Sequence, residues 1–320
     1  MDTLNTTAIE GGVQLTGEKA AEFNNRTLLE RLKPELQIMK YGEKNMTMPK
    51  HAGDLAKWRR FNSLAVNTTE ITEGVTPAAV NITVSVVSAT VKEYGSWCET
   101  TDVMDLEAID PVMTEYAEIL GENAGESLES VVNAILYAGT NAVFPVGATQ
   151  TVEVASTMKI AEIDVLKIRR ALKRAKVKPI KLPNGKTGYL AFIHTDVATD
   201  LMQLDAWVQS HKYVDNAPIL EGSIGEWHGI YFVEYDLAVK SAGAGVGGTV
   251  DVYKTLVIGK GAFGVPDIEG SSKPEMVVKK MGENGNDPLN QRGTCGWKSF
   301  IAAVRLQELA IVRYECTATA

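Results

Sequence analysis

The chain has 320 residues, of which 45% are hydrophobic and 22% charged, and its net charge is −8. This length and composition are typical of a globular protein of about two domain-sized units, and the acidic balance argues against a protein whose main task is to bind nucleic acid tightly. Cys98, Cys295 and Cys316 are too few and too widely spaced for a disulfide framework or a zinc site, which indicates a reducing compartment.

The N-terminal residues, 1 to about 21, are polar and show no periodicity, which is typical of a flexible arm. The following run, from Ala21 to Ile38, has the apolar spacing of a helix, with Pro34 as an interruption. Two interpretations stay open, an ordinary start of a domain or an arm that reaches a neighbouring subunit.

Two β-type runs follow, from Leu55 to Phe61 and from Val80 to Val91, separated by a long polar stretch. The apolar residues of the second run change parity at Val86 and Val87. A bulge, or a strand that passes between two environments, would produce such a change.

Two long strands with a polar tip predict an extended hairpin that a single subunit leaves largely solvated, and an isolated hairpin is marginal in water. One interpretation places the strands inside a larger sheet, and the other lays them across a second subunit. On the second interpretation the subunit-interface candidates in this region are Trp58, Arg59, Arg60, Thr72, Thr76 and Pro77.

The stretch from Ile109 to Gly139 predicts one long helix, with Asp110 as N-cap, Pro111 at the first helical position and Gly139 after the end. Apolar residues recur at three- and four-residue steps. Those that we expect to pack this spine helix are Tyr116, Leu120, Leu128, Val131 and Leu136, while the small Gly121, Ala124 and Gly125 let it lie close to a sheet.

The opposite face of this helix carries glutamates at helical spacing, with no lysine or arginine among them: Glu115, Glu118, Glu122, Glu126 and Glu129. Such a face is more often solvated or an interface than a site of catalysis or metal binding. Glu115, Glu118 and Glu122 are therefore interface candidates.

A second helix is predicted from Ile163 to Ala175, with cations crowding one side and the C-terminal end, where they suit the helix dipole. A phosphate site is one interpretation. A solvated face, or a contact for the carboxylates of another subunit, is favoured, with Arg169, Arg170 and Lys173 as the candidates.

No motif of an enzyme is present. His51, His194, His211 and His228 lack metal-ligand spacing, and no nucleophile elbow or phosphate-binding loop occurs. No apolar run is long enough to cross a membrane, and the N-terminus lacks the basic and apolar regions of a signal peptide. We expect a soluble intracellular protein with no catalytic, metal or cofactor site. A soluble enzyme that uses the acidic helix face remains a minor alternative.

Family-specific strings carry the decisive resemblance. FNSLAVNTTEITEGVTP, VSATVKEYGSWCETTDVMDLEAIDPVMTEYAEILGENAGESLESVVNAILYAGTN and the ending DPLNQRGTCGWKSFIAAVRLQELAIVRYE resemble the major capsid protein of tailed bacteriophages. They are most similar to the short-tailed subfamily typified by coliphage N-four. The resemblance covers about residues 36–140 and 285–315, and the strings contain no chemistry.

The resemblance implies an α+β chain with the tailed-phage major capsid fold. Its parts map onto the sequence as the N-terminal arm and short helix (1–45), the extended hairpin loop and start of the peripheral domain (46–108), the spine helix of the peripheral domain (109–155), the axial domain (156–285) and C-terminal strands returning to the peripheral domain (286–320).

The resemblance further implies self-assembly as hexamers and pentamers into an icosahedral shell around double-stranded DNA, without sequence-specific binding. It implies portal and scaffolding partners, allows a decoration protein, and implies a virion location after assembly in the host cytoplasm. A nanocompartment shell of the encapsulin type, holding a cargo enzyme, is the alternative. Nothing in the sequence identifies a lysine–asparagine pair for covalent cross-linking, so none is predicted.

Overall fold

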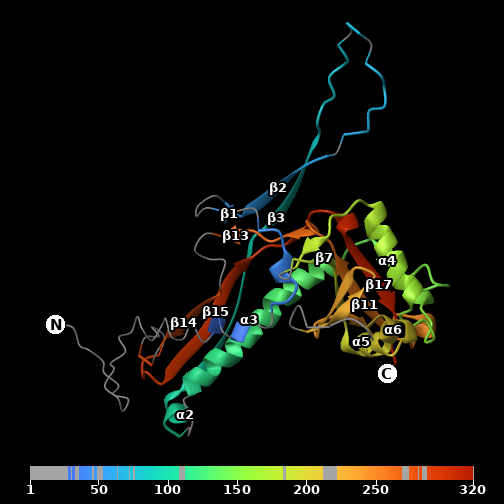
Figure 1. Cartoon of the computed structure of the whole chain (residues 1–320). Coiled ribbons are helices and arrows are strands. Elements are labelled where there is room, and N and C mark those ends of the chain that lie inside the picture. Colours follow the sequence, from blue (N-terminus) through green and yellow to red (C-terminus); the bar gives the residue numbers. More distant parts are fainter. Residues whose placement is uncertain are drawn as a thin grey trace.

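The computed structural model describes residues 28–29, 31–32, 36–44, 47–48, 53–62, 64–71, 73–74, 76–107, 112–182, 185–211, 222–268, 274–279, 281–282 and 287–319. Three parts are visible in Figure 1: a long helix beside a narrow sheet, a larger sheet with helices at one side, and a ribbon that projects away from both.

The larger sheet has eight strands in the order β5-β17-β11-β7-β9-β8, with β10 paired to β11 and β6 to β7. Its central strands are nearly continuous apolar runs, as expected of strands covered on both faces. The bounds are β5 Ala142–Val143, β6 Ile180–Lys181, β7 Thr187–Ile193, β8 Ser223–Trp227, β9 Ile230–Glu234, β10 Lys240–Ser241, β11 Val252–Ile258 and β17 Ile311–Cys316.

Helices α4 (Glu162–Arg174), α5 (Thr195–Met202) and α6 (Asp205–His211) accompany this sheet (Figure 1). Helix α4 buries Val165, Ile168 and Leu172 and places acidic residues in its first turn and basic ones in its last, which suits the helix dipole. Helix α5 begins after His194, whose Nδ1 accepts the backbone N–H of Asp196 at 3.1 Å.

The predicted spine is helix α3, Val112–Tyr137, which follows the short α2, Asp102–Glu107. It lies along a three-stranded sheet of order β14-β15-β4, formed by Glu275–Lys279, Arg292–Ile301 and Lys92–Thr101. Leu120, Leu128 and Leu136 are buried, whereas Tyr116 and Val131 are partly buried and packed against the same core.

The N-terminal segment also packs on α3, which changes the role of its small residues. A Cβ atom on Gly121 would lie 2.7 Å from the carbonyl oxygen of Leu28 and 3.1 Å from the Cβ of Arg31. Gly121 therefore admits the N-terminal helical residues, and the prediction that it lets the helix approach a sheet is wrong. Residues 1–27 and Asp110–Pro111 lie outside the described residues.

Glu129 corrects the prediction of a uniformly acidic exposed face. Its side chain is 0% exposed and accepts the backbone N–H groups of Gln37 (3.2 Å), Ile38 and Met39 (3.3 Å). The hydroxyl of Tyr235 also donates to Glu129. A glutamate at helical spacing from exposed ones is buried here because otherwise unpaired backbone donors of the N-terminal segment surround it.

The hairpin is a separate two-stranded sheet of β2, Leu55–Phe61, and β3, Val84–Thr90. Its register is continuous from Leu55 opposite Thr90 to Phe61 opposite Val84, so the parity change does not reflect a bulge. Val84 and Val86 are exposed, whereas Val87 and Ala89 are partly buried. The strand passes between two environments, and the alternative of a strand pair inside a larger sheet is wrong.

The strands after residue 286 divide between the two main sheets. Strand β15 pairs with β4 beside α3, in line with a return to the spine helix, but β17 pairs with β11 and β5 in the larger sheet. The run IVRYEC is buried on both faces, and only the centre of that sheet provides such an environment.

Short elements complete the fold. They are η1 Met39–Tyr41, β1 Thr47–Met48, η2 Thr151–Glu153, η3 Val246–Gly248, β12 Phe263–Gly264, β13 Asp267–Ile268, β16 Val304–Arg305 and η4 Glu308–Ala310, with β1 paired to β13 and β12 to β16.

We expect Leu128→Asp to prevent stable folding, because it places a charge where the wild-type side chain is buried in the main core around α3. The cost is roughly 3–5 kcal/mol of the free energy of unfolding, measured by chemical denaturation. The exposed Ala134→Asp on the same helix is the control and should cost less than about 1 kcal/mol. Equal stability of the two variants would contradict the packing of α3.

A second prediction concerns pH. Burial raises the pKa of Glu129 above its ordinary value of 4.5, and the backbone donors from Ile38, Met39 and Gln37 offset part of that rise. The stabilising contribution of the protonated form is complete below pH 4.5 and is lost as pH rises through the higher pKa of the folded state. We expect Glu129→Gln to be more stable than the wild type at neutral pH and equal to it below pH 4.5.

Denaturation curves at several pH values test this expectation, with Glu126→Gln, which changes an exposed glutamate of the same helix, as the matched control. A Glu129→Gln variant that is less stable than the wild type at neutral pH would mean that the ionised carboxylate is the favoured partner of the backbone donors.

Candidate functional site

The projecting hairpin exposes apolar side chains along its length. Phe61 is 69% exposed, Val66 84% and Ile71 75%, and the described residues between 62 and 83 form no strand. The hairpin extends beyond the body of the subunit (Figure 1). Folding of one subunit therefore leaves a long apolar surface in water, which is typical of a surface that another molecule covers.

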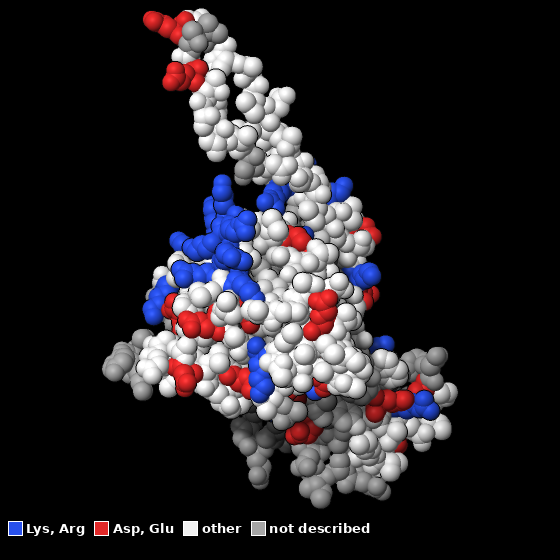
Figure 2. Space-filling model, turned by 90° about the vertical axis from the view of Figure 1, so that its right-hand side faces the viewer, with Lys and Arg blue, Asp and Glu red and all other residues white. Residues whose placement is uncertain are grey.

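The tip of the hairpin is acidic. No lysine or arginine occurs between Phe61 and Val91, and Glu70 and Glu73 are exposed near the tip (Figure 2). The interface candidates Thr76 and Pro77 are also exposed, whereas Thr72 lies outside the described residues.

Basic residues gather at the base of the hairpin instead. Lys57, Arg59 and Arg60 line a hollow of about 660 Å³ together with Trp58. Arg59 and Arg60 are exposed, as an interface requires. Trp58 is buried, and its indole packs directly on Gly264. A Cβ atom at position 264 would lie only 2.8 Å from the indole ring. Trp58 is thus a packing residue that anchors the hairpin to its own subunit, and its prediction as an interface residue is wrong.

Helix α4 carries the strongest group of positive charges. Arg169, Arg170, Lys173, Arg174 and Lys176 are all exposed on it or directly after it. Figure 2 shows blue side chains gathered on the face that α4 turns outward. No ion pair among the described residues engages Arg169, Arg170 or Lys173, so their charges are free to meet another molecule.

The acidic face of α3 is partly neutralised within the chain. Arg31 forms ion pairs with Glu118 and, at 3.3 Å, with Glu122, while Glu115 stays exposed without a described ion pair. The carboxylates raise the pKa of the Arg31 guanidinium further. Sequence spacing could not reveal this partner, because Arg31 is 87 residues from Glu118.

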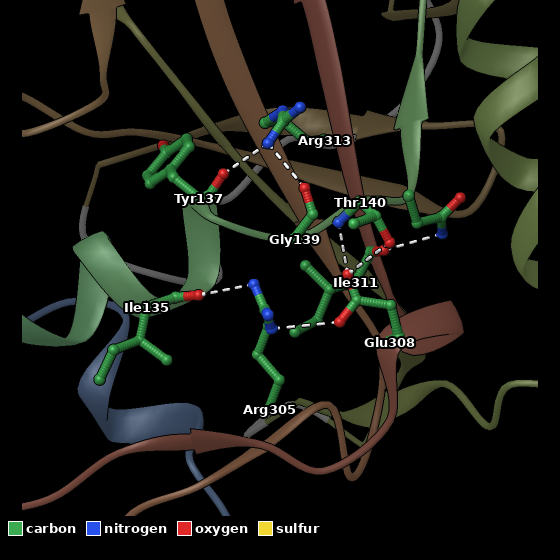
Figure 3. Close-up of polar contacts among 9 residues, drawn as sticks. Ile135, Tyr137, Gly139, Thr140, Arg305, Glu308, Ile311 and Arg313 are labelled. Atoms are coloured by element: carbon green, nitrogen blue, oxygen red, sulfur yellow. Dashed lines mark hydrogen bonds and ion pairs between the residues drawn. The ribbon is translucent and has the colours of Figure 1, made fainter.

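The C-terminal end of α3 is fixed by two arginines that the sequence analysis missed (Figure 3). Arg305 Nη1 donates to the carbonyl oxygen of Ile135 at 3.1 Å, and Arg313 Nη1 donates to those of Tyr137 at 2.5 Å and Gly139 at 2.7 Å. Glu308 accepts the backbone N–H of Thr140 and pairs with Arg305. The one sequence feature that could have indicated such partners is the lack of any basic residue in the last turn of α3, which leaves its carbonyl groups to be met from elsewhere.

This arrangement offers surfaces for contact with other molecules. Among the described residues, no group of three His, Cys, Asp or Glu side chains could hold a metal ion. The largest upward pKa shifts belong to core tyrosines and cysteines such as Tyr235 and Cys316, and burial is their main cause. No helix in the described parts of the chain is long and apolar enough to cross a membrane.

Comparison with solved structures identifies the architecture. The chain is similar to the capsid of Ralstonia phage GP4, with 12% identity, coverage of 86% of this chain and 87% of that one, and a TM-score of 0.67. It is similar to a chain of the cyanophage Pam1 capsid, with 15% identity, 99% and 98% coverage and a TM-score of 0.66. It is also similar to the capsid of cyanophage P-SCSP1u, with 14% identity, coverage of 99% of this chain and 94% of that one, and a TM-score of 0.63.

At these identities the likeness shows the fold, which confirms the expected tailed-phage major capsid fold. No curated protein matches the sequence. The family model described as phage capsid protein matches residues 84–314, which is well over half of the chain. The match does not favour the encapsulin alternative, and it makes the chain a structural protein rather than an enzyme. The chain belongs to the phage capsid protein family, as a structural major capsid protein.

Proposed function

We propose that copies of this chain assemble as hexamers and pentamers into the icosahedral shell of a tailed phage that encloses double-stranded DNA. The observation that carries this proposal is the hairpin of β2 and β3, which exposes apolar side chains that nothing described in its own subunit covers. A two-stranded ribbon of this kind gains stability only when it packs on something else. A neighbouring copy of the chain is the partner that the family supplies.

The geometry of such a contact favours rings. A projecting element that packs on a different surface of the next copy makes a heterologous contact, and repeated heterologous contacts close into rings when the rotation between copies allows it. Hexamers and pentamers of a shell are rings of this kind. The hairpin's position at one end of the molecule supports a head-to-tail contact of this type (Figure 1).

The charges of the interface candidates support contacts between basic and acidic surfaces of neighbouring copies. The hairpin tip carries Glu70 and Glu73, whereas Arg59, Arg60 and the outer face of α4 are cationic and exposed. Complementary charges at an interface steer association and fix its register more than they add affinity. We infer that these basic surfaces meet carboxylates of neighbouring copies, Glu115 among them.

The finer identity is also a proposal. The resemblance of the hairpin and C-terminal strings supports a capsid protein of the coliphage N-four type, with portal and scaffolding partners, a decoration protein as a further option, and assembly in the host cytoplasm. The same resemblance supports the division into arm, extended loop, peripheral and axial parts. The net charge of −8 suits a wall that encloses DNA without binding it tightly.

Deletion of residues 69–78 tests the role of the hairpin. Because the described residues of this tip are exposed and outside any strand, the subunit should still fold, with a melting temperature within about 2 °C of the wild type. Assembly should fail, so that negative-stain microscopy shows neither capsomer rings nor shells. If the deletion melts the monomer instead, the hairpin belongs to the subunit's own core and the interface proposal falls.

Charge reversal on α4 tests the cationic surface separately. We expect Arg169→Glu combined with Arg170→Glu to change the free energy of unfolding by less than about 1 kcal/mol, since both side chains are exposed. Assembly measured by light scattering should be strongly reduced. The matched variant Arg169→Lys with Arg170→Lys retains the charge and should assemble. Normal assembly of the reversed variant would remove α4 from the interface.

A further inference from the structure

Two of the three cysteines face each other across a pair of strands. In the antiparallel register of β15 and β4, Cys295 lies directly opposite Cys98, although 196 residues separate them in the chain. Both thiols are free. Because residues directly opposite in a pleated pair point to the same face of the sheet, the two side chains share one face.

The strand register brings the two cysteines close to the separation of a disulfide. The backbone N–H of Asp102 donates to the carbonyl oxygen of Gln291 at 3.0 Å, which continues the same register by one pair. Hydrogen-bonded pairs alternate along an antiparallel ladder, so Cys98 and Cys295 also form a hydrogen-bonded pair, with Cα atoms about 5.5 Å apart. Disulfides span Cα separations of roughly 4.4–6.8 Å, which includes this pair. They also need Cβ atoms about 3.5–4.5 Å apart, whereas opposite Cβ atoms of a hydrogen-bonded pair lie roughly 5.5 Å apart, so the two strands must draw together by about 1 Å where the bond forms.

The two thiols differ in access. Cys295 is 1% exposed and belongs to the core that includes α3, whereas Cys98 is partly exposed on β4, which has β15 as its sole neighbour in the three-stranded sheet. Burial raises the pKa of both thiols, that of Cys295 to about 12. Neither cysteine is therefore a reactive thiolate at neutral pH, and the pair should stay reduced inside a cell.

We propose that Cys98 and Cys295 form a redox-sensitive staple, which is open in the reducing cytoplasm and closes as a disulfide when a soluble disulfide oxidises the pair. The chemistry depends only on the fold of the subunit. Its biological setting, a virion that leaves the reducing cell at lysis, rests on the proposed function. Structural disulfides persist in oxidising surroundings and are rare in the cytosol.

The reaction is an exchange with a disulfide such as oxidised glutathione. Cys98 is the accessible thiol, and at mildly alkaline pH the fraction of it that is deprotonated attacks one glutathione sulfur; the glutathione disulfide bond breaks, and one glutathione leaves. The Cys295 thiolate then attacks the Cys98 sulfur of the mixed disulfide and releases the second glutathione. The protein dithiol loses two electrons, oxidised glutathione gains them, and the two cysteine protons end on two glutathione thiols.

The staple would act on the hairpin. Strand β4 continues from the hairpin strand β3 through Val91, and β15 lies between β4 and β14. A covalent bond from Cys98 to Cys295 joins the strand that leads out of the hairpin to a C-terminal strand packed on α3. Since the bond closes a long loop, it restricts the unfolded chain strongly. The oxidised subunit should resist unfolding more than the reduced one.

The test treats the full-length protein with oxidised glutathione at mildly alkaline pH, followed by alkylation of remaining thiols under denaturing conditions and peptide mass spectrometry without reduction. We expect one cross-linked peptide pair containing Cys98 and Cys295, with Cys316 alkylated. The melting temperature should rise by several degrees on oxidation, and dithiothreitol should reverse the shift.

Cys98→Ser is the matched variant and should show no shift on oxidation, whereas Cys316→Ala should form the same cross-link as the wild type. Three results would overturn the proposal: Cys98 joined to Cys98 of a second copy, a glutathione adduct on Cys98 without the cross-link, or full alkylation of both thiols. These measurements use the unassembled subunit, so a failure of the shell proposal leaves their interpretation unchanged.

Discussion

The unpaired carbonyl groups at the C-terminal end of α3 set the constraint on which the fold depends. A helix leaves its last carbonyls without intrahelical donors, and α3 has no basic residue in its last turn to meet them. Arg305 and Arg313 supply the donors from the last strands of the chain. Arg313 also pairs with the fully buried Glu315 at 2.6 Å. The end of the long helix is thus held by residues that belong to the return path of the chain.

This return path also joins the two sheets. Strand β15 lies beside α3, and β17 lies between β5 and β11, with a short link that contains both Arg305 and Glu308. At the other side of α3, Glu129 holds the backbone of residues 37–39 and Gly121 admits Leu28. The long helix is therefore fixed to the N-terminal segment, the narrow sheet and the larger sheet. Among the described residues, the hairpin packs on the rest of the subunit only at its base, around Trp58.

The periodicity of the sequence predicted the long helix, its buried leucines and the solvated hairpin, because these features depend on the spacing of apolar residues that are close together in the chain. It could not predict that Glu129 is buried, because Glu129 continues the same helical spacing of glutamates as Glu122. Its carboxylate faces backbone donors that are about 90 residues away in the chain. The periodicity also misassigned Trp58, since a tryptophan between basic residues reads equally well as an interface anchor or a packing residue, and only Gly264 decides. The family strings supplied the role of the chain, while the contacts that define its surfaces arise from residues distant in sequence.

The distribution of charge then separates what stabilises the subunit from what is left for assembly. Paired charges, such as Arg31 with Glu118 and Arg305 with Glu308, lie where segments of one chain meet. Charged side chains that form no ion pair with another described residue lie on the outer face of α4, at the base of the hairpin and, with opposite sign, at its tip. Opposite signs on two different surfaces of the same chain can pair between copies, either head to tail or in a two-fold contact in which each surface meets the other. We favour the head-to-tail contact for this chain because repeated contacts of that kind can close into the rings proposed above.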